Sequence, residues 1–241
     1  MMPFDWLTAH PVAHRGLHDA AAGVIENTPS AVSAAVAAGY AIEVDLQITA
    51  DNEAMVHHDD VLGRLTEGEG RLAALPAAEL KRVPFRATAD RMLTLSDLLD
   101  LVAGRSALFL ELKSRFDRDL RLARRVAEVI GTYAGPVATM SFDPSPIEAI
   151  RDFVPDLPRG IVAQRYSDEG DGHDKLGYLL HGVRSRPHFI AYHVKDLPAP
   201  APFLARHVLG LPLLSWTVRT QEDRARAARY ADQIIFEGFR P

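Results

Sequence analysis

Charged residues stand at the ends of four short apolar runs in this chain. The residues concerned are His14 and Arg15, Glu43 and Asp45, His58 and Asp59, and Glu111 and Lys113. Burying charges in strand-like segments is costly unless they are paired or bound to a metal. A chain that repeats this cost is predicted to build one polar site at the end of a sheet. Histidines there suit proton transfer, carboxylates a hard cation, and Arg and Lys an anion.

The carboxylates in these runs are spaced to share a face. Side chains two apart on a strand point the same way, so Glu43 pairs with Asp45 and Glu111 with Lys113. Converging carboxylates repel one another without a compensating cation, and ligation by oxygen alone suits Mg²⁺ or Ca²⁺ better than Zn²⁺. In the alternative, Glu111 pairs with Lys113 or Arg15 and there is no metal. The residues alone leave both interpretations open.

Two histidines are candidates for acid/base chemistry, because a neutral imidazole can accept or donate a proton near pH 7. His14 and His58 each end a run and each precede a charged neighbour. Strand alternation favours His58 over His57, because His57 would share the opposite face with Met55. His193, at the end of a later run, could line the same pocket.

Cationic and aromatic residues near the same runs could contact a substrate. Arg15, Lys113 and Arg64 are candidates for binding phosphate oxygens, and their alternative role is to neutralise the acidic cluster. Trp216 could offer a ring face to an alkyl or glycerol moiety, or could be a half-buried aromatic under a loop.

Strand-like and helical patterns alternate along the whole chain, which predicts a parallel sheet. The expected strands are 11–15, 41–48, 54–58, 107–113, 137–142, 159–163, 188–194, 212–218 and 233–237. With 54–58 set aside as an excursion, eight strands would close into a TIM (β/α)₈ barrel. The rival is a doubly wound open sheet, but no Gly-rich phosphate loop follows the first strand. The sequence therefore favours a barrel, as one α/β domain over 1–241.

Capping residues mark where the helices should begin. Thr28 precedes Pro29 and Gly39 ends that segment, while Thr94 opens a helix expected to end at Gly104. Ser145 has capping-box spacing and is predicted to open the helix after the fifth expected strand.

Two parts of the predicted barrel are irregular. The region 60–92, rich in Gly and Pro, is expected to be a long excursion over the barrel mouth. No full helix is expected after the last strand, so the N-terminal segment or a partner subunit is predicted to cover the gap.

Bulk composition excludes several classes of protein. The 241 residues carry a formal net charge of −5, so no global basic field invites nucleic acid or anionic membrane. The absence of cysteine excludes disulfides, thiolate metal sites and Cys nucleophiles. We find neither a signal-peptide pattern nor an apolar stretch long enough for membrane insertion, and expect a soluble, cytoplasmic protein.

The ordered set of motifs resembles the glycerophosphodiester phosphodiesterase family along essentially the whole chain. The matching motifs are His14-Arg15-Gly16, Glu26-Asn27-Thr28, Glu43-Val44-Asp45, His58-Asp59 with Leu62, Arg64 and Thr66, Glu111-Leu112-Lys113, and Trp216-Thr217. That family comprises TIM barrels that hydrolyse glycerophosphodiesters to glycerol 3-phosphate and an alcohol, usually with Mg²⁺ or Ca²⁺.

The resemblance implies a role for each matching residue. His14 and His58 would be the acid/base pair, and Glu43, Asp45 and Glu111 would ligate one divalent cation. The remaining site residues are phosphate contacts or line the site: Arg15, Lys113, Glu26, Asn27 and Trp216. The resemblance further implies a small-molecule substrate from glycerol and lipid metabolism.

The sequence departs from the family pattern in two places. Ile25 replaces a frequent Pro before the Glu-Asn-Thr motif, which should alter a turn and leave the chemistry unchanged. The last strand continues into Phe236-Glu237-Gly238-Phe239 where the family often has Thr-Asp-x-Pro, which leaves the role of Glu237 open.

The predicted function is therefore metal-dependent phosphodiester hydrolysis with histidine acid/base catalysis. The first alternative is a lyase resembling sphingomyelinase D or phosphatidylinositol-specific phospholipase C, and a non-enzymatic phosphodiester-binding protein is a distant third. The nucleophile (water or a substrate hydroxyl), the choice of metal, the oligomeric state and the head group stay open. The head group depends on loops 60–92 and 164–187.

Overall fold

The computed structural model describes residues 4–165, 182 and 184–241 of the chain. Most of the 164–187 loop therefore lies outside the described residues. None of the described helices is long and apolar enough to cross a bilayer.

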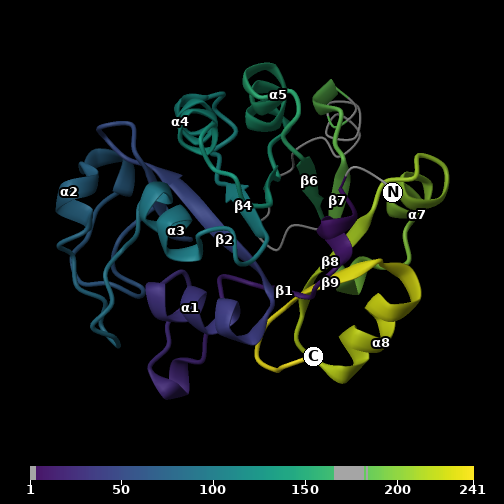
Figure 1. The fold of residues 1–241 in the computed structure, drawn as a ribbon, viewed down its shortest axis with the longest axis horizontal. Helices are drawn as coiled ribbons and strands as arrows, with labels where there is room; N and C mark the ends of the chain where they lie inside the picture. The colour runs from purple at the N-terminus through teal and green to yellow at the C-terminus, as the bar shows by residue number, and fades with distance from the viewer. Residues whose placement is uncertain (1–3, 166–181, 183) are drawn as a thin grey trace.

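Eight parallel strands form a closed barrel (Figure 1). They are β1 (Val12–Ala13), β2 (Ala41–Ile48), β4 (Leu108–Leu112), β5 (Val137–Ser141), β6 (Arg159–Ala163), β7 (Phe189–His193), β8 (Leu213–Val218) and β9 (Gln233–Phe236). Closure is direct, because Val12 of β1 is in register with Ala41 of β2 on one side and Ile235 of β9 on the other. The predicted TIM barrel is confirmed and the open doubly wound sheet is wrong.

Helices surround the barrel, as Figure 1 shows. The longer ones are α1 (Pro29–Ala38), α3 (Leu95–Val102), α4 (Arg121–Ile130), α5 (Pro144–Phe153), α7 (Pro200–His207) and α8 (Gln221–Tyr230). Shorter pieces are α2 (Ala77–Leu80) and the 3₁₀ turns η1 (Asp5–Thr8), η2 (Ala20–Ala22), η3 (Leu72–Ala74) and η4 (Val194–Asp196).

Helix starts follow the capping rules with one correction. The side chains of Thr28 and Thr94 accept backbone N–H groups at the starts of α1 and α3, as predicted. The start of α5 was placed wrongly at Ser145. Asp143 is the cap instead: its carboxylate accepts the N–H of Ser145, while Pro144 supplies a preset helical φ at the first position. Similarly, α3 stops at Val102, with Ala103 and not Gly104 as its left-handed cap.

The segment between β2 and α3 is the predicted excursion. It begins with β3 (Ala54–Val56), which pairs antiparallel with β2. Together with β3, the rest of the segment forms a small apolar core of its own, in which Met55, Leu72, Leu80 and Phe85 are buried. The excursion is thus a packed lobe beside β2, as Figure 1 shows.

The N-terminal segment fills the barrel interior. Leu7 is buried with the inward-facing side chains Val12 and Phe109, and the Trp6 ring lies 5.8 Å from that of Phe109. The N-terminal segment was predicted to cover a gap after the last strand, but it packs inside the barrel. No helix follows β9 within the described residues, but β9 pairs directly with β1, and Tyr40 and Phe239 pack on the outer side of the barrel against Phe236.

The inward-facing side chains of β2 change from apolar to charged along the strand. On β2, Ala41 belongs to the apolar interior, whereas Glu43 and Asp45 follow it on the same face. The apolar layers give the barrel a packed base. The polar side chains therefore gather at the carboxyl ends of the strands.

Candidate active site

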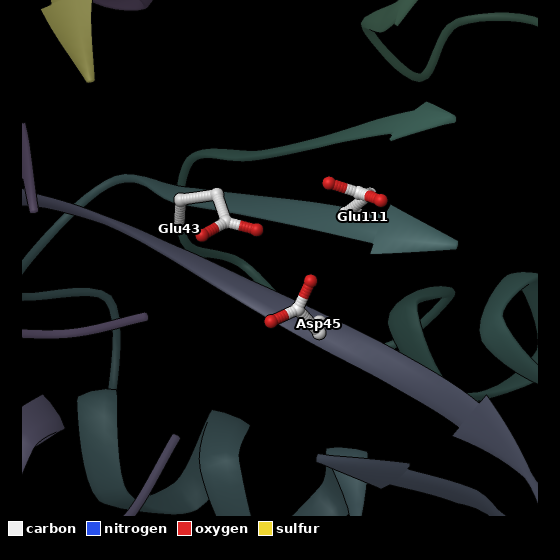
Figure 2. A group of neighbouring side chains, drawn as sticks. All are labelled: Glu43, Asp45 and Glu111. Carbon is white, nitrogen blue, oxygen red and sulfur yellow. The ribbon is translucent and has the colours of Figure 1, made fainter. Parts of the chain in front are cut away.

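Three carboxylates from two neighbouring strands meet at the carboxyl end of the barrel. Glu43 and Asp45 lie on β2, and Asp45 is directly opposite Glu111 of β4 in the parallel register. One oxygen from each lies within 4.8 Å of the others, and all three residues are buried. Figure 2 shows the carboxylates turned toward one another. The predicted convergence is thus present in the structure.

Burial and mutual repulsion act differently on two of these acids. Burial raises the pKa of Glu43 well above its usual range, and the neighbouring Asp45 and Glu111 add to the effect. Burial would also raise the pKa of Asp45, but Lys113 and Arg15 outweigh it and hold that pKa below its usual range. The Oε2 atom of Glu43 accepts the Arg15 backbone N–H, whereas its Oε1 has no hydrogen-bond partner among the described residues.

Two cations partly balance the acidic cluster. Lys113 Nζ lies 2.8 Å from Asp45 Oδ1 and 2.6 Å from Glu111 Oε1. Arg15 Nε lies 3.2 Å from Asp45 Oδ2, and its Nη1 donates to Glu26 Oε1 at 2.8 Å. The Lys113–Glu111 pair considered from the sequence is therefore present. Arg15 also pairs with Glu26, so the three carboxylates of the cluster do not have two cations to themselves.

A tight turn after β1 sets the position of Arg15. Arg15 itself has φ +57°, and Gly16 has φ +81°. A Cβ on Gly16 would stand 2.8 Å from the carbonyl carbon of Ala31 in α1, so both the left-handed backbone and the close helix require glycine. The turn aims the Arg15 backbone N–H at Glu43 and its side chain at Asp45.

Asn27 also orients Asp45. It is fully buried, its Nδ2 donates to Asp45 Oδ2 at 2.8 Å, and its Oδ1 accepts the Asp45 backbone N–H at 3.2 Å. The Asn27 backbone N–H in turn donates to the Arg15 carbonyl at 2.9 Å. The Glu26-Asn27 motif is thus a scaffold for the acidic cluster.

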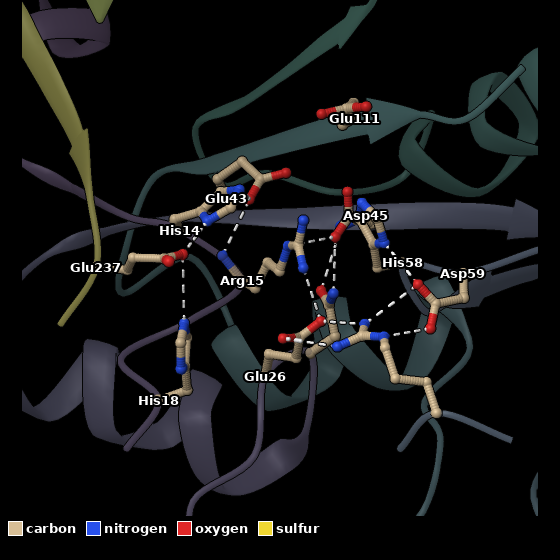
Figure 3. Close-up of polar contacts among 12 residues, drawn as sticks. His14, Arg15, His18, Glu26, Glu43, Asp45, His58, Asp59, Glu111 and Glu237 are labelled. Atoms are coloured by element: carbon tan, nitrogen blue, oxygen red, sulfur yellow. Dashed lines mark hydrogen bonds and ion pairs between the residues drawn. The ribbon is translucent and has the colours of Figure 1, made fainter. Parts of the chain in front are cut away.

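Two imidazoles flank the carboxylates, each with Nδ1 against an acid (Figure 3). His14 Nδ1 lies 2.5 Å from Glu237 Oε2, and His14 Nε2 lies 3.9 Å from Glu43 Oε2. Burial lowers the pKa of His14, although its hydrogen bond with Glu237 opposes the shift. His58 Nδ1 lies 2.8 Å from Asp59 Oδ1.

The neighbouring His57 faces away from the site. It is buried, and its ring lies 6.3 Å from that of Phe85 in the core of the lobe. This is the face that it was predicted to share with Met55.

Arg64 joins the lobe to the site. Its guanidinium donates to Asp59 Oδ2 at 2.6 Å and to Glu26 Oε1 at 2.7 Å. From the sequence, Arg64 was considered as a phosphate contact or as a cation that neutralises nearby acids. In the structure it bridges Asp59, which contacts His58, and Glu26, which contacts Arg15.

Aromatic side chains form a separate group at the mouth. The ring of Trp216 lies 5.0 Å from that of His193 and 5.4 Å from that of Phe142. Trp216 Nε1 is buried with no hydrogen-bond partner in the part of the chain that the structure describes. His193 Nδ1 lies 3.3 Å from Asp196 Oδ2. The structure thus places Trp216 beside His193 and Phe142.

Glu237 is a residue whose role the sequence left open. It follows β9 directly and meets three basic side chains: His14, His18 at 3.7 Å, and Arg219 at 2.5 Å. Burial alone would raise its pKa, but the hydrogen bonds from these partners hold that pKa well below its usual range. One sequence signal could have identified Glu237 as a site residue. It is a charged residue at the end of an apolar run, as Glu43 and Glu111 are.

Comparison with known proteins places this arrangement in a family. A sequence model of the glycerophosphoryl diester phosphodiesterase family matches residues 14–236. The chain belongs to this family of phosphoric diester hydrolases. A glycerophosphodiester phosphodiesterase of Caldanaerobacter subterraneus is 27% identical over 228 residues, which cover 89% of this chain and 88% of that protein.

Solved structures share the fold of this family member. A phosphodiesterase of Oleispira antarctica superposes with a TM-score of 0.78 at 20% identity, covering 94% of this chain and 91% of that chain. A glycerophosphodiester phosphodiesterase of Thermotoga maritima gives a TM-score of 0.72 at 22% identity, covering 94% of both chains.

The raised pKa of Glu43 predicts that this acid costs stability when no divalent cation is present. The folded protein holds the Glu43 proton more tightly than the unfolded chain, so stability falls as pH rises above the ordinary value of 4.5. We expect Glu43→Gln to raise the unfolding temperature in chelator at pH 8 and to have little effect at pH 4. Each kcal/mol gained corresponds to roughly 2–4 °C for a chain of this size.

Glu111→Gln is the matched control, because it removes the same charge but breaks the pair with Lys113. It should not stabilise the protein at pH 8. Thermal unfolding followed by circular dichroism from pH 4 to pH 8 measures both variants. Equal unfolding temperatures of Glu43→Gln and the parent protein at pH 8 would contradict this account.

Proposed function

We propose that this protein hydrolyses glycerophosphodiesters to glycerol 3-phosphate and an alcohol. The observation that carries the proposal is the meeting of Glu43, Asp45 and Glu111 within 4.8 Å at the barrel mouth, in a chain of this family. The related barrel from Oleispira antarctica is described in complex with the product sn-glycerol 3-phosphate, which supports a ligand of this class. The cytoplasm is the compartment that we propose, on the sequence features given above.

We infer that the three carboxylates hold one divalent cation, Mg²⁺ or Ca²⁺. The donor set fits such an ion, because it consists of oxygens alone, and buried Glu43 Oε1 has no other partner among the described residues. The cation would supply positive charge to the phosphate oxygens as a Lewis acid. Asn27, by fixing Asp45, would keep one ligand oriented.

Arg15 and Lys113 are the cations that we assign to the phosphate. Both lie beside Asp45 at the mouth, and charge fixed in place stabilises charge that develops on phosphorus at no cost in reorganisation. Glu26 holds Arg15 in position. Trp216 is proposed to pack against the glycerol or alkyl part of the substrate.

His14 and His58 are proposed to carry the two proton transfers. One imidazole removes a proton from the nucleophile and the other protonates the leaving alkoxide. With Nδ1 of each bound to a carboxylate, Nε2 is the atom that remains for the reaction. The nucleophile is either water or the substrate's own glycerol hydroxyl, and the second route passes through a cyclic phosphate.

A panel of glycerophosphodiesters tests the proposed reaction. Choline, ethanolamine, inositol and glycerol head groups are assayed for release of glycerol 3-phosphate, with and without prior chelation. We expect release from at least one substrate, loss of turnover after thorough chelation, and recovery on addition of Mg²⁺ or Ca²⁺. Turnover that survives chelation, with a cyclic phosphate as the end product, would favour the metal-free lyase. Calorimetric binding with no product from any substrate would indicate a binding protein.

Replacing either proposed acid/base residue should nearly abolish turnover. We expect His14→Ala and His58→Ala each to lower kcat by roughly 10²- to 10⁴-fold, since each removes one proton transfer. The matched control is His10→Ala, because His10 is exposed and stands before the barrel. Unfolding temperatures establish that the fold persists. A variant of His14 or His58 that keeps most of the parent activity would show that its role is wrongly assigned.

A further inference from the structure

Two similar chains of hydrogen bonds, or relays, hold the two imidazoles at the mouth. Each relay runs from an imidazole to a carboxylate and from that carboxylate to an arginine. In one, His58 Nδ1 meets Asp59, and Asp59 accepts a hydrogen bond from Arg64 Nε at 2.6 Å. In the other, His14 Nδ1 meets Glu237, and Glu237 Oε1 accepts one from Arg219 Nε at 2.5 Å. The first relay lies within one family motif, whereas the second joins parts of the chain 223 residues apart.

The barrel closure fixes the geometry of the second relay. The His14 backbone N–H donates to the Phe236 carbonyl at 2.9 Å, so the turn after β1 is tied to the end of β9. The Glu237 backbone N–H donates to the Val218 carbonyl at 3.2 Å, which ties the same end to β8. Both oxygens of Glu237 have basic partners: Oε2 contacts His14, with His18 Nε2 farther away at 3.7 Å, and Oε1 contacts Arg219. Glu237 is therefore held on both its backbone and its side chain.

The contact has a consequence for the proton on the His14 ring. An ionised carboxylate can only accept hydrogen bonds, so a neutral His14 must carry its proton on Nδ1. Its Nε2 is then a free acceptor, on the side of the ring that lies toward Glu43. The opposite tautomer would set the Nδ1 lone pair against the carboxylate and put the proton on Nε2.

We infer that Glu237 is a positioning residue that holds His14 in the tautomer with Nε2 free to accept a proton, and that Arg219 holds Glu237. The same logic operates wherever a buried acid orients a catalytic imidazole. The kinetic consequence rests on the proposed function, but the tautomer does not.

The isosteric variant Glu237→Gln gives a directed test. Arg219 is a donor, so it should retain the amide oxygen and turn the amide NH₂ toward His14 Nδ1. That NH₂ can only donate, so the neutral imidazole should move its proton to Nε2. We expect the variant to reverse the tautomer and lower kcat by roughly 10²- to 10⁴-fold with KM unchanged. Glu237→Asp keeps an accepting carboxylate and should recover the tautomer and part of kcat.

The tautomer is read from long-range ¹⁵N–¹H spectra of full-length protein labelled with ¹⁵N-histidine, at a pH where the rings are neutral. The His14 signals are assigned by their loss in His14→Gln. The matched control is Glu222→Gln on α8, since that side chain is 83% exposed and pairs only with Arg226 in the described part of the chain. The control should leave both the spectrum and kcat unchanged. Unfolding temperatures are measured for every variant.

Two results would overturn the inference. One is a His14 proton on Nε2 in the unmodified protein; the other is an unchanged His14 spectrum and kcat in Glu237→Gln. Neither result would contradict the proposed hydrolysis, which is tested separately by the activity of the parent protein. Conversely, if the parent protein hydrolysed none of the panel substrates, the proposed function would fail, and the spectra would still decide the role of Glu237.

Discussion

Like-charge repulsion among three buried carboxylates is the constraint on which the site depends. One oxygen from each of Glu43, Asp45 and Glu111 lies within 4.8 Å of the others, and all three residues are buried. Burial and the neighbouring carboxylates raise the pKa of Glu43, whereas Lys113 and Arg15 stabilise the ionised form of Asp45 and lower its pKa. Burial of this kind without full pairing lowers stability, and it is typical of sites where function requires it.

The barrel makes this arrangement possible. Its base is filled by apolar side chains from the strands and by Leu7 from the N-terminal segment, which fixes the strands in register. That register sets Asp45 opposite Glu111, and the pleat puts Glu43 on the same face. A rigid frame therefore holds the acids together, while Arg15, Lys113 and Asn27 set the orientation of each oxygen. Functional groups at the carboxyl ends of the strands are the general design of barrel enzymes.

Much of this could be predicted from the sequence because it depends on short-range rules. The two-residue period of a strand put Glu43 beside Asp45 and separated His58 from His57. Capping chemistry located the starts of α1 and α3, and failed at α5 because Asp143 followed by Pro144 offers a better start than Ser145.

The contacts that the sequence did not predict join distant parts of the chain. No local pattern reveals that Glu237 reaches His14, because the pairing depends on how β9 meets β1. The pairing of Arg64 is a second example, because Asp59 and Glu26 come together only when the lobe packs beside β2. The N-terminal segment was misplaced because its apolar residues fit the barrel interior as well as they would an outer gap.

Catalysis by this site requires that oxygens of Glu43, Asp45 and Glu111 share one cation. Anomalous diffraction from crystals grown with Mn²⁺ tests directly whether the three residues bind one ion. Mn²⁺ scatters anomalously and accepts the same oxygen ligands as Mg²⁺. We predict one strong anomalous peak with an oxygen of Glu43, Asp45 and Glu111 each within about 2.0–2.6 Å of it. A peak bound elsewhere, or no peak at saturating Mn²⁺ with Lys113 still bridging Asp45 and Glu111, would contradict it.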